Sequence, residues 1–354
     1  MLFAATGLTM AAYLESDHKV VDVPEPPPTP APPPRIIRPI PPRPPVRDNE
    51  LQRLLRQVDV GEPQHYRGLT VFPLELRSGG HASGIRSLDE ALRNRWISIR
   101  ELDRPTVSSV AIRNDSRHHV FLMAGEILLG GKQNRIVRND VLLPPDSRYI
   151  DVDVYCGEKE RWNTPITTYR SAPGVANDRL RKMAARESSQ NRIWSEIDTQ
   201  LSRSKVASPT RDYQQVYEDR DLKRRADECV SRFRRCWRSR TVGAVVLSGG
   251  VIQSCDVFAD PSLFEKLRDK ITRSWAVNMP EVRSDWRGRV AVPTKQAIHA
   301  FLREAQRSNL SSQHTPGVGA LYRITGSVDG NALIRRGRVV HSALFPAGYP
   351  IYHR

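Results

Sequence analysis

The segment MAGEILLGGKQNR, residues 123–135, places a double glycine between apolar runs and surrounds it with charged and amide side chains. The apolar character begins at Val120, continues to Leu129 and resumes at Ile136. Adjacent glycines accept the positive φ angles of a tight chain reversal. We therefore predict a β-hairpin here, with a cluster of polar side chains at its turn.

Strand patterns continue on both sides of this hairpin. Residues 149–155, YIDVDVY, alternate strictly between apolar and polar side chains, which is typical of a half-buried strand. Shorter apolar runs at Val110–Ile112 and Val141–Leu143 are bounded by turn-forming residues. Upstream, a short helix is predicted to begin near Asn49, and residues 66–74 are predicted to form a first strand.

Beyond residue 175 the apolar spacing changes to that of a helix. One helix carries a clean apolar stripe: Leu222, Ala226, Cys229, Val230, Phe233 and Trp237. Residues 178–240 contain 17 basic and ten acidic residues. A DNA-binding helix is one interpretation of this charge, but no helix-turn-helix or zinc pattern accompanies it, so a solvated basic face is favoured.

These patterns predict an α+β fold. It comprises a β-rich unit of sandwich or barrel type, a central helical layer at about 175–238, and a C-terminal portion with a β-hairpin and helices. The hairpin is expected at 242–258, followed by a helix that Asp260 and Pro261 begin. We predict one domain over residues 49–350.

The N-terminal region has a different composition. Residues 1–20 form an apolar N-terminal segment, and its apolar run, residues 2–14, is too short to span a bilayer. Residues 21–48 form a proline-rich linker with 13 of the 27 prolines. The apolar segment suits a truncated signal or an anchor. The sequence therefore favours export or the cell envelope over the cytoplasm, with a membrane tether through the N-terminus.

Charge and motifs narrow the function classes. The net charge of +16 is typical of a solvated basic surface, with attraction to an anionic small molecule as the alternative, while sequence-specific nucleic-acid recognition is not expected. The four cysteines show no CxxC spacing, and the chain contains neither HExxH nor GxSxG. The Gly-Lys pair at 131–132 lacks the remaining P-loop residues. We predict no metal and no cofactor.

Glu126 is the leading candidate for chemistry because it lies inside an apolar run, where a buried carboxylate requires a partner. Lys132 and Arg135 across the hairpin are its expected partners. The cluster either binds a ligand or forms a structural ion pair, and both interpretations stay open. The candidate catalytic residues are Glu126 and Asp256. The candidate ligand-binding residues are Glu126, Lys132, Gln133, Asn134, Arg135, Asp140, Arg161 and Trp162.

The strings AGEIL at 124–128 and GGKQNR at 130–135 resemble the hallmark of the ARG and rhodanese-phosphatase-superfamily-associated protein domain, first type. Further matching pieces follow in order: LLPP at 142–145, VYCGE at 154–158 with Arg161-Trp162, and DVF at 256–258 with Pro261. The resemblance covers about residues 60–347. One departure is the loop 156–162, which lacks the glycine that the family more often has just before the arginine.

The resemblance implies a context of nucleotide or ADP-ribose metabolism and no particular catalytic mechanism. Our leading hypothesis is a binding or accessory domain that recognises a phosphate-bearing nucleotide or ADP-ribose-type ligand through the hairpin. The first alternative is a hydrolase of such a ligand with Glu126 or Asp256 as general base. The second is a tethered cell-envelope interaction module in which the hairpin is purely structural.

Overall fold

The structure is a computed structural model that describes residues 49–80, 82–102, 108–161, 166–277, 279 and 293–348. These described residues all belong to one compact unit, 47–354. The apolar segment 1–20, the proline-rich linker 21–48 and Trp162 lie outside the described residues.

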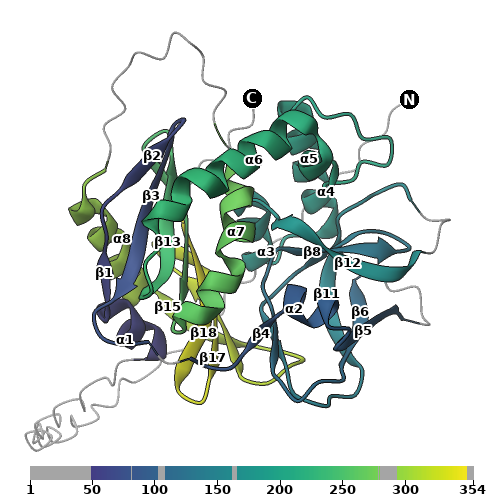
Figure 1. Ribbon diagram of the computed structural model, residues 1–354, viewed down its shortest axis with the longest axis horizontal. Coiled ribbons are helices and arrows are strands. Elements are labelled where there is room, and N and C mark those ends of the chain that lie inside the picture. The colour runs from purple at the N-terminus through teal and green to yellow at the C-terminus, as the bar shows by residue number, and fades with distance from the viewer. Residues whose placement is uncertain are drawn as a thin grey trace, which may run out of the picture. The chain divides into compact units, whose positions relative to one another are not determined.

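A nine-stranded antiparallel sheet forms one half of the unit (Figure 1). Its strand order is β1 (Val58–Val60), β3 (Leu69–Leu76), β13 (Thr241–Ser248), β14 (Val251–Phe258), β18 (Arg338–Pro346), β17 (Val328–Arg335), β16 (Ala320–Thr325) and β15 (Asn309–Gln313), with β2 (Gln64–Tyr66) paired to β3. The central strands are continuously apolar because both faces of the sheet are covered.

Helices cover both faces of this sheet. The helices α1 (Glu50–Arg56) and α8 (Lys295–Arg307) share one apolar cluster with one face of the sheet. The helices α6 (Arg220–Phe233) and α7 (Pro261–Val277) share another cluster with the opposite face. Neighbouring strand residues therefore point into different cores.

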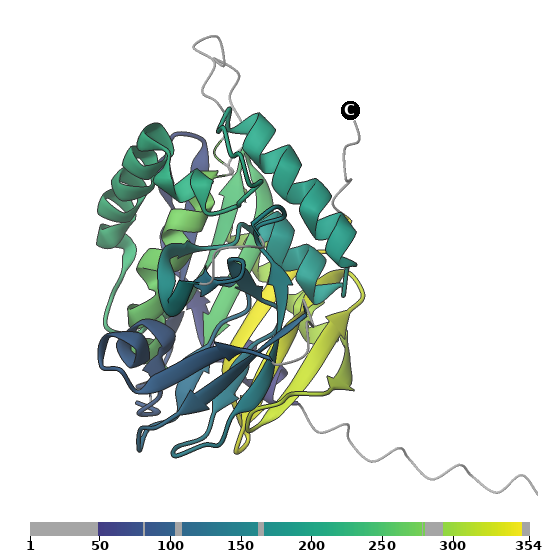
Figure 2. The same cartoon turned by 90° about the vertical axis from the view of Figure 1, so that its right-hand side faces the viewer.

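The candidate hairpin belongs to a second β region. A six-stranded sheet has the order β12 (Ile166–Val175), β8 (Glu126–Gly131), β9 (Arg135–Val137), β11 (Ile150–Cys156), β6 (Ser109–Asn114) and β5 (Ile97–Glu101). A three-stranded sheet has the order β10 (Val141–Leu143), β7 (Val120–Leu122) and β4 (Arg86–Ser87), and α2 (Leu88–Arg93) packs beside it. Figure 2 shows the yellow C-terminal strands next to the blue and teal strands of this region.

A helical layer connects the two β regions. It consists of α3 (Asp178–Ala185), α4 (Gln190–Arg203), α5 (Gln215–Glu218), α6 and the 3₁₀ turn η1 (Arg234–Cys236). Apolar side chains of α3, α4 and α5 pack in one cluster with β8, β9 and β12. The predicted α+β class is therefore confirmed, with a β-rich unit and a central helical layer.

The prediction of one strand over residues 66–74 is wrong. The chain reverses at Arg67 and Gly68, which have φ angles of 44° and 79°, and β2 pairs back on β3. Two successive positive φ angles are typical of the short turns that close β-hairpins. The apolar pattern alone did not show the turn, because Arg67 is not a residue that favours such angles.

Candidate functional site

The hairpin at 123–135 forms as a pair of short strands. Ile127 pairs with Ile136, and Leu128 pairs with Arg135. Both glycines at its end have positive φ, and the side chain of Asn134 accepts a hydrogen bond from the Gly130 amide at 3.0 Å. The side chain of Lys132 is exposed at the turn. The predicted hairpin is present, and its asparagine supports its own turn.

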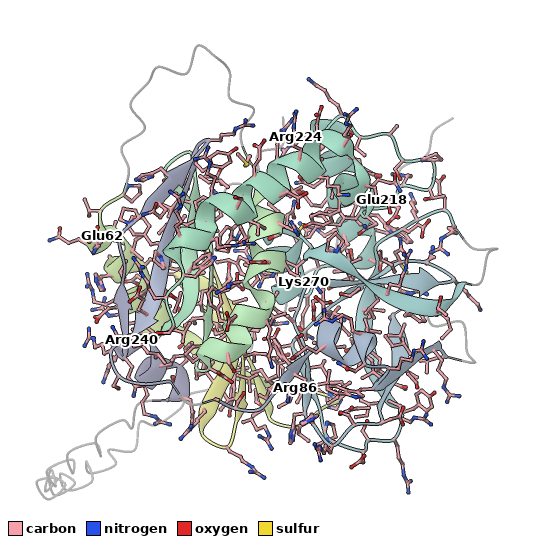
Figure 3. The ribbon with its side chains drawn as sticks, in the orientation of Figure 1. Glu62, Arg86, Glu218, Arg224, Arg240 and Lys270 are labelled. Carbon is pink, nitrogen blue, oxygen red and sulfur yellow. The ribbon has the colours of Figure 1, made fainter. Side chains whose placement is uncertain are left out.

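Glu126 lies in the core and pairs with Lys270 of α7, so the prediction of Lys132 or Arg135 as its partner is wrong. Its Oε1 is 2.6 Å from Lys270 Nζ, and neither side chain is more than 6% exposed. Lys270 also donates to Asp89 at 3.0 Å and to Ser171 at 2.6 Å. Burial alone would lower the pKa of Lys270, but the Glu126 and Asp89 carboxylates outweigh it and raise that pKa. In Figure 3, Lys270 lies on α7, toward the teal strands.

A second buried network joins Asp140 and Asp256. His341 on β18 contacts Asp140 through Nδ1 at 2.7 Å and Asp256 through Nε2 at 3.1 Å. Arg181 on α3 donates to both oxygens of Asp256 and to the Ala124 carbonyl. Burial alone would lower the pKa of His341, but the two carboxylates raise it to about 9. The histidine therefore carries a charge at neutral pH.

These two networks place Glu126, Asp140 and Asp256 at internal contacts between the β regions. Each carboxylate is at most 2% exposed and is held by a cation. A general base must reach a substrate proton within hydrogen-bond distance. In this structure the three carboxylates form buried ion pairs without solvent contact, an arrangement typical of structural ion pairs.

Arg135 and Gln133 lie beneath the hairpin and support the loop that follows β11. Arg135 pairs with Glu101 at 3.2 Å and donates to Gln133 and to the Cys156 sulfur. Gln133 in turn donates to the Lys159 carbonyl at 3.2 Å. Both side chains are buried. They orient the loop that carries Glu158 and Arg161.

A cavity of about 220 Å³ opens where this loop, the hairpin and the segment before α5 meet. We call it the hairpin pocket. Its lining residues are Leu129, Gly130, Asn134, Glu158, Arg161, Arg170, Thr210, Asp212, Gln214, Gln215 and Glu218. Figure 3 labels Glu218, which lies at the end of α5.

Hydrogen bonds fix the polar floor of the hairpin pocket. Glu158 accepts from Arg161 Nε at 2.8 Å and from the Asn134 amide at 3.3 Å. Asn134 Nδ2 donates to Asp212 at 2.8 Å, and Asp212 also accepts from the Gln214 amide. The buried side-chain oxygen Oε1 of Gln214 accepts no hydrogen bond from the described residues. Since buried acceptors are nearly always paired in proteins, this oxygen is a candidate acceptor for a ligand hydroxyl group.

Asp212 has the electrostatics of a proton-transfer group. Burial raises the pKa of its carboxyl to about 7, and the Glu158 carboxylate adds to this rise. Hydrogen bonds from the Gln214 amide and Asn134 oppose the rise without cancelling it. A carboxyl with a pKa near neutrality is available both as an acid and as a base.

Comparison with known proteins identifies the family. Residues 57–345 match the family model of the ARG and Rhodanese-Phosphatase-superfamily-associated Protein domain. The chain belongs to this family. No curated protein and no solved structure matches the chain. The family resemblance predicted from the sequence is thereby confirmed, with closely similar bounds.

The family domain contains every residue of the hairpin pocket. Among the predicted ligand-binding residues that the structure describes, only Asn134 and Arg161 lie in the pocket lining. Sequence reasoning missed Asp212 and Gln214, which lie in a connection between helices and give no local signal. It also missed Lys270, although a lysine at the spacing of Leu263 and Leu267 falls within the apolar stripe of α7.

The described residues contain no group of three or more His, Cys, Asp and Glu side chains suited to a metal ion. None of the helices that they form is long and apolar enough to cross a membrane.

Proposed function

We propose that this protein is a binding domain that takes the sugar-phosphate part of a nucleotide-type ligand in the hairpin pocket. The observation that carries the proposal is the buried, unpaired Gln214 oxygen in a cavity that also holds two arginines and two buried carboxyl groups. Such a lining offers both cations and hydrogen-bond acceptors around one small space.

The chemistry of the lining supports a ligand with two kinds of group. Arg161 and Arg170 present guanidinium groups, which suit phosphate oxygens. Glu158, Asp212 and Gln214 offer acceptors for sugar hydroxyl groups. Arg161 is held by Glu158 and by the Gly131 carbonyl, so it is oriented in advance.

The size of the cavity limits how much of a ligand enters it. Pockets that enclose drug-sized ligands typically measure about 300–1,000 Å³. At about 220 Å³ the hairpin pocket suits a fragment, such as a ribose with one phosphate. A base or a second phosphate would lie outside.

Calorimetry with ribose 5-phosphate, ADP-ribose, ribose and inorganic phosphate tests the proposal. Ribose 5-phosphate and ADP-ribose should bind more tightly than ribose or phosphate alone. Arg170→Ala should weaken ribose 5-phosphate about tenfold, because a charge-assisted hydrogen bond is lost. Arg93→Ala removes an exposed arginine of α2 outside the pocket and should have no effect. No binding by the wild type, or equal loss in both variants, would refute the proposal.

The raised pKa of Asp212 supports a second candidate, a hydrolase that acts on the same class of ligand with Asp212 as general acid or base. We then expect turnover of ADP-ribose-type substrates to change with an apparent pKa near 7. Asp212→Asn should abolish turnover while calorimetry still shows binding. Binding without any turnover by the wild type would leave the domain as a binding module.

A further inference from the structure

A second hollow, along α6, lies outside the hairpin pocket and shares no lining residue with it. It measures about 720 Å³ between β2 and the C-terminal half of α6, and its lining residues are Gln64, His65, Tyr66, Arg67, Glu228, Ser231, Arg232, Phe233 and Arg235. A smaller hollow of about 450 Å³ shares Glu228 and Ser231 with it and follows α6 back to Arg220. The two together form a groove, which we call the α6 groove.

The α6 groove follows the helix for most of its length. From Arg220 to Arg235 the helical rise of 1.5 Å per residue gives about 22 Å. Figure 1 shows α6 lying across one side of the unit, and Figure 3 labels Arg224 on it. The groove is therefore long enough to contact several units of a linear ligand.

The positive charge of the groove is only partly neutralised. The groove is lined by six basic residues and two acidic ones: Arg67, Arg220, Lys223, Arg224, Arg232 and Arg235 against Asp227 and Glu228. Arg67 pairs with Glu228 at 3.4 Å, and Arg224 pairs with Asp221 at 2.9 Å. Within the part of the chain that the structure describes, the exposed side chains of Arg232 and Arg235 form no salt bridge. These cations are available to an external anion.

Two of the arginines of the groove lie over an aromatic ring. The guanidinium carbons of Arg67 and Arg232 are 5.4 and 5.7 Å from the centre of the Tyr66 ring. The Tyr66 hydroxyl donates to Glu228, and the ring contacts Phe233 edge-on. These contacts hold Tyr66 in the wall of the groove with cations beside its ring.

We propose that the α6 groove binds single-stranded nucleic acid without sequence preference. A basic groove that follows a phosphate backbone, together with an aromatic side chain for base stacking, is the typical means by which proteins bind such strands. The site is separate from the hairpin pocket and does not depend on the function proposed for it. The nucleic acid would then contact the basic face of α6, which the sequence predicted to be solvated.

The same residues do not suit a membrane surface. Helices that bind membranes through the interface bury an apolar face in it. The apolar stripe of α6 is buried inside the protein, and Val251 is the one exposed large hydrophobic residue among those described. The larger hollow of the groove has a mostly polar lining, which fits a nucleotide chain better.

Fluorescence anisotropy with labelled single strands of about 15 nucleotides of mixed sequence tests the proposal. The wild type should bind the strands and lose affinity as salt rises. Arg232→Glu with Arg235→Glu should weaken binding at least tenfold and reduce the salt slope by about 1.4, since each lost phosphate contact removes about 0.7. The charge-matched control, Arg192→Glu with Arg203→Glu, changes two exposed arginines of α4 and should change binding less than twofold.

Tyr66→Leu separates stacking from charge, because it removes the ring and keeps every arginine. It should weaken binding about fivefold or more. Circular dichroism establishes that each variant is folded. The proposal is overturned if the wild type does not bind, if the two charge variants lose affinity equally, if Tyr66→Leu binds normally, or if duplex DNA or anionic vesicles of phosphatidylserine bind as tightly as single strands.

Discussion

At the scale of a single residue, Lys270 neutralises the buried carboxylate of Glu126 and so stabilises the folded protein. Glu126 is fully buried, and the ammonium group of Lys270 is its only cation within 4 Å among the described residues. Asp89 and Ser171 complete the hydrogen bonds of that ammonium group. The ion pair is internal, so its removal should affect stability and leave the hairpin pocket unchanged.

We expect Lys270→Met to lower the free energy of unfolding by about 3–5 kcal/mol, because it leaves the Glu126 charge buried without a partner. Adding Glu126→Gln to this variant should restore much of the loss. Urea unfolding at pH 7 measures both. The control is Lys266→Met, one turn earlier on α7, where the partly exposed pair with Glu90 should contribute only about 1 kcal/mol or less. Equal losses for the two lysines would contradict the assignment.

At the scale of an element, the turn between β7 and β8 connects the two buried networks. The Gly125 amide donates to the Val137 carbonyl at 2.8 Å, and its carbonyl accepts from Ala176 at 2.7 Å. Its φ angle is +94°, and a Cβ at this position would lie 2.7 Å from Cγ of Arg181. The turn therefore needs glycine for backbone conformation and for the close passage of the arginine.

We expect Gly125→Ala to destabilise the protein by about 2 kcal/mol or more. A left-handed alanine is strained, and the displaced Arg181 would no longer neutralise Asp256 fully. Gly249→Ala is the matched control, because Gly249 has a φ of +57° and a methyl group there would have open space within 4 Å. Thermal unfolding should show the smaller loss for Gly249→Ala. A larger loss there would contradict the role of Arg181.

At the scale of the whole molecule, buried charge connects the large sheet to the second β region. His341 lies on β18 of the large sheet, while Asp140 directly precedes β10 of the other region. The rings of Phe121 and Phe258 pack against the imidazole and exclude water from it. The protonation state of one histidine therefore affects the cohesion of both sheets.

Stability should fall as pH rises from about 6.5 to 8. The pKa of His341 is about 9 when folded, against about 6.5 when unfolded. The unfolded chain loses its proton first, so the stabilisation is complete below pH 6.5 and declines at about 1.4 kcal/mol per pH unit above it. The midpoint of urea unfolding, measured across this pH range, tests whether stability falls as pH rises.

Asp212 also makes the free energy of unfolding fall as pH rises, because its pKa is raised on folding. Its contribution lies mainly between pH 4 and 7, so it is a control for the contribution of His341. Asp212→Asn should reduce that lower part of the decline, to which the raised pKa values of Asp178 and Glu126 also contribute, and keep the decline from pH 7 to 8. Buried thiols with raised pKa, such as Cys156, contribute the same sign only above about pH 8. A flat profile between pH 7 and 8 would contradict a charged His341.

The sequence alone determined most of the local elements and the family, although it missed the turn at Arg67 and Gly68. The hairpin at 123–135, the start of α7 after Asp260 and the helical layer all follow from spacings of two to four residues, which local backbone geometry sets. Only the tertiary structure decided which charges meet. Lys270 lies 144 residues from Glu126, and His341 lies 201 residues from Asp140. Burying a carboxylate costs desolvation free energy, so the sequence indicates that Glu126 needs a cation as partner. Which cation lies beside it depends on how elements distant in the sequence pack together. The same packing places Asp212 in the hairpin pocket.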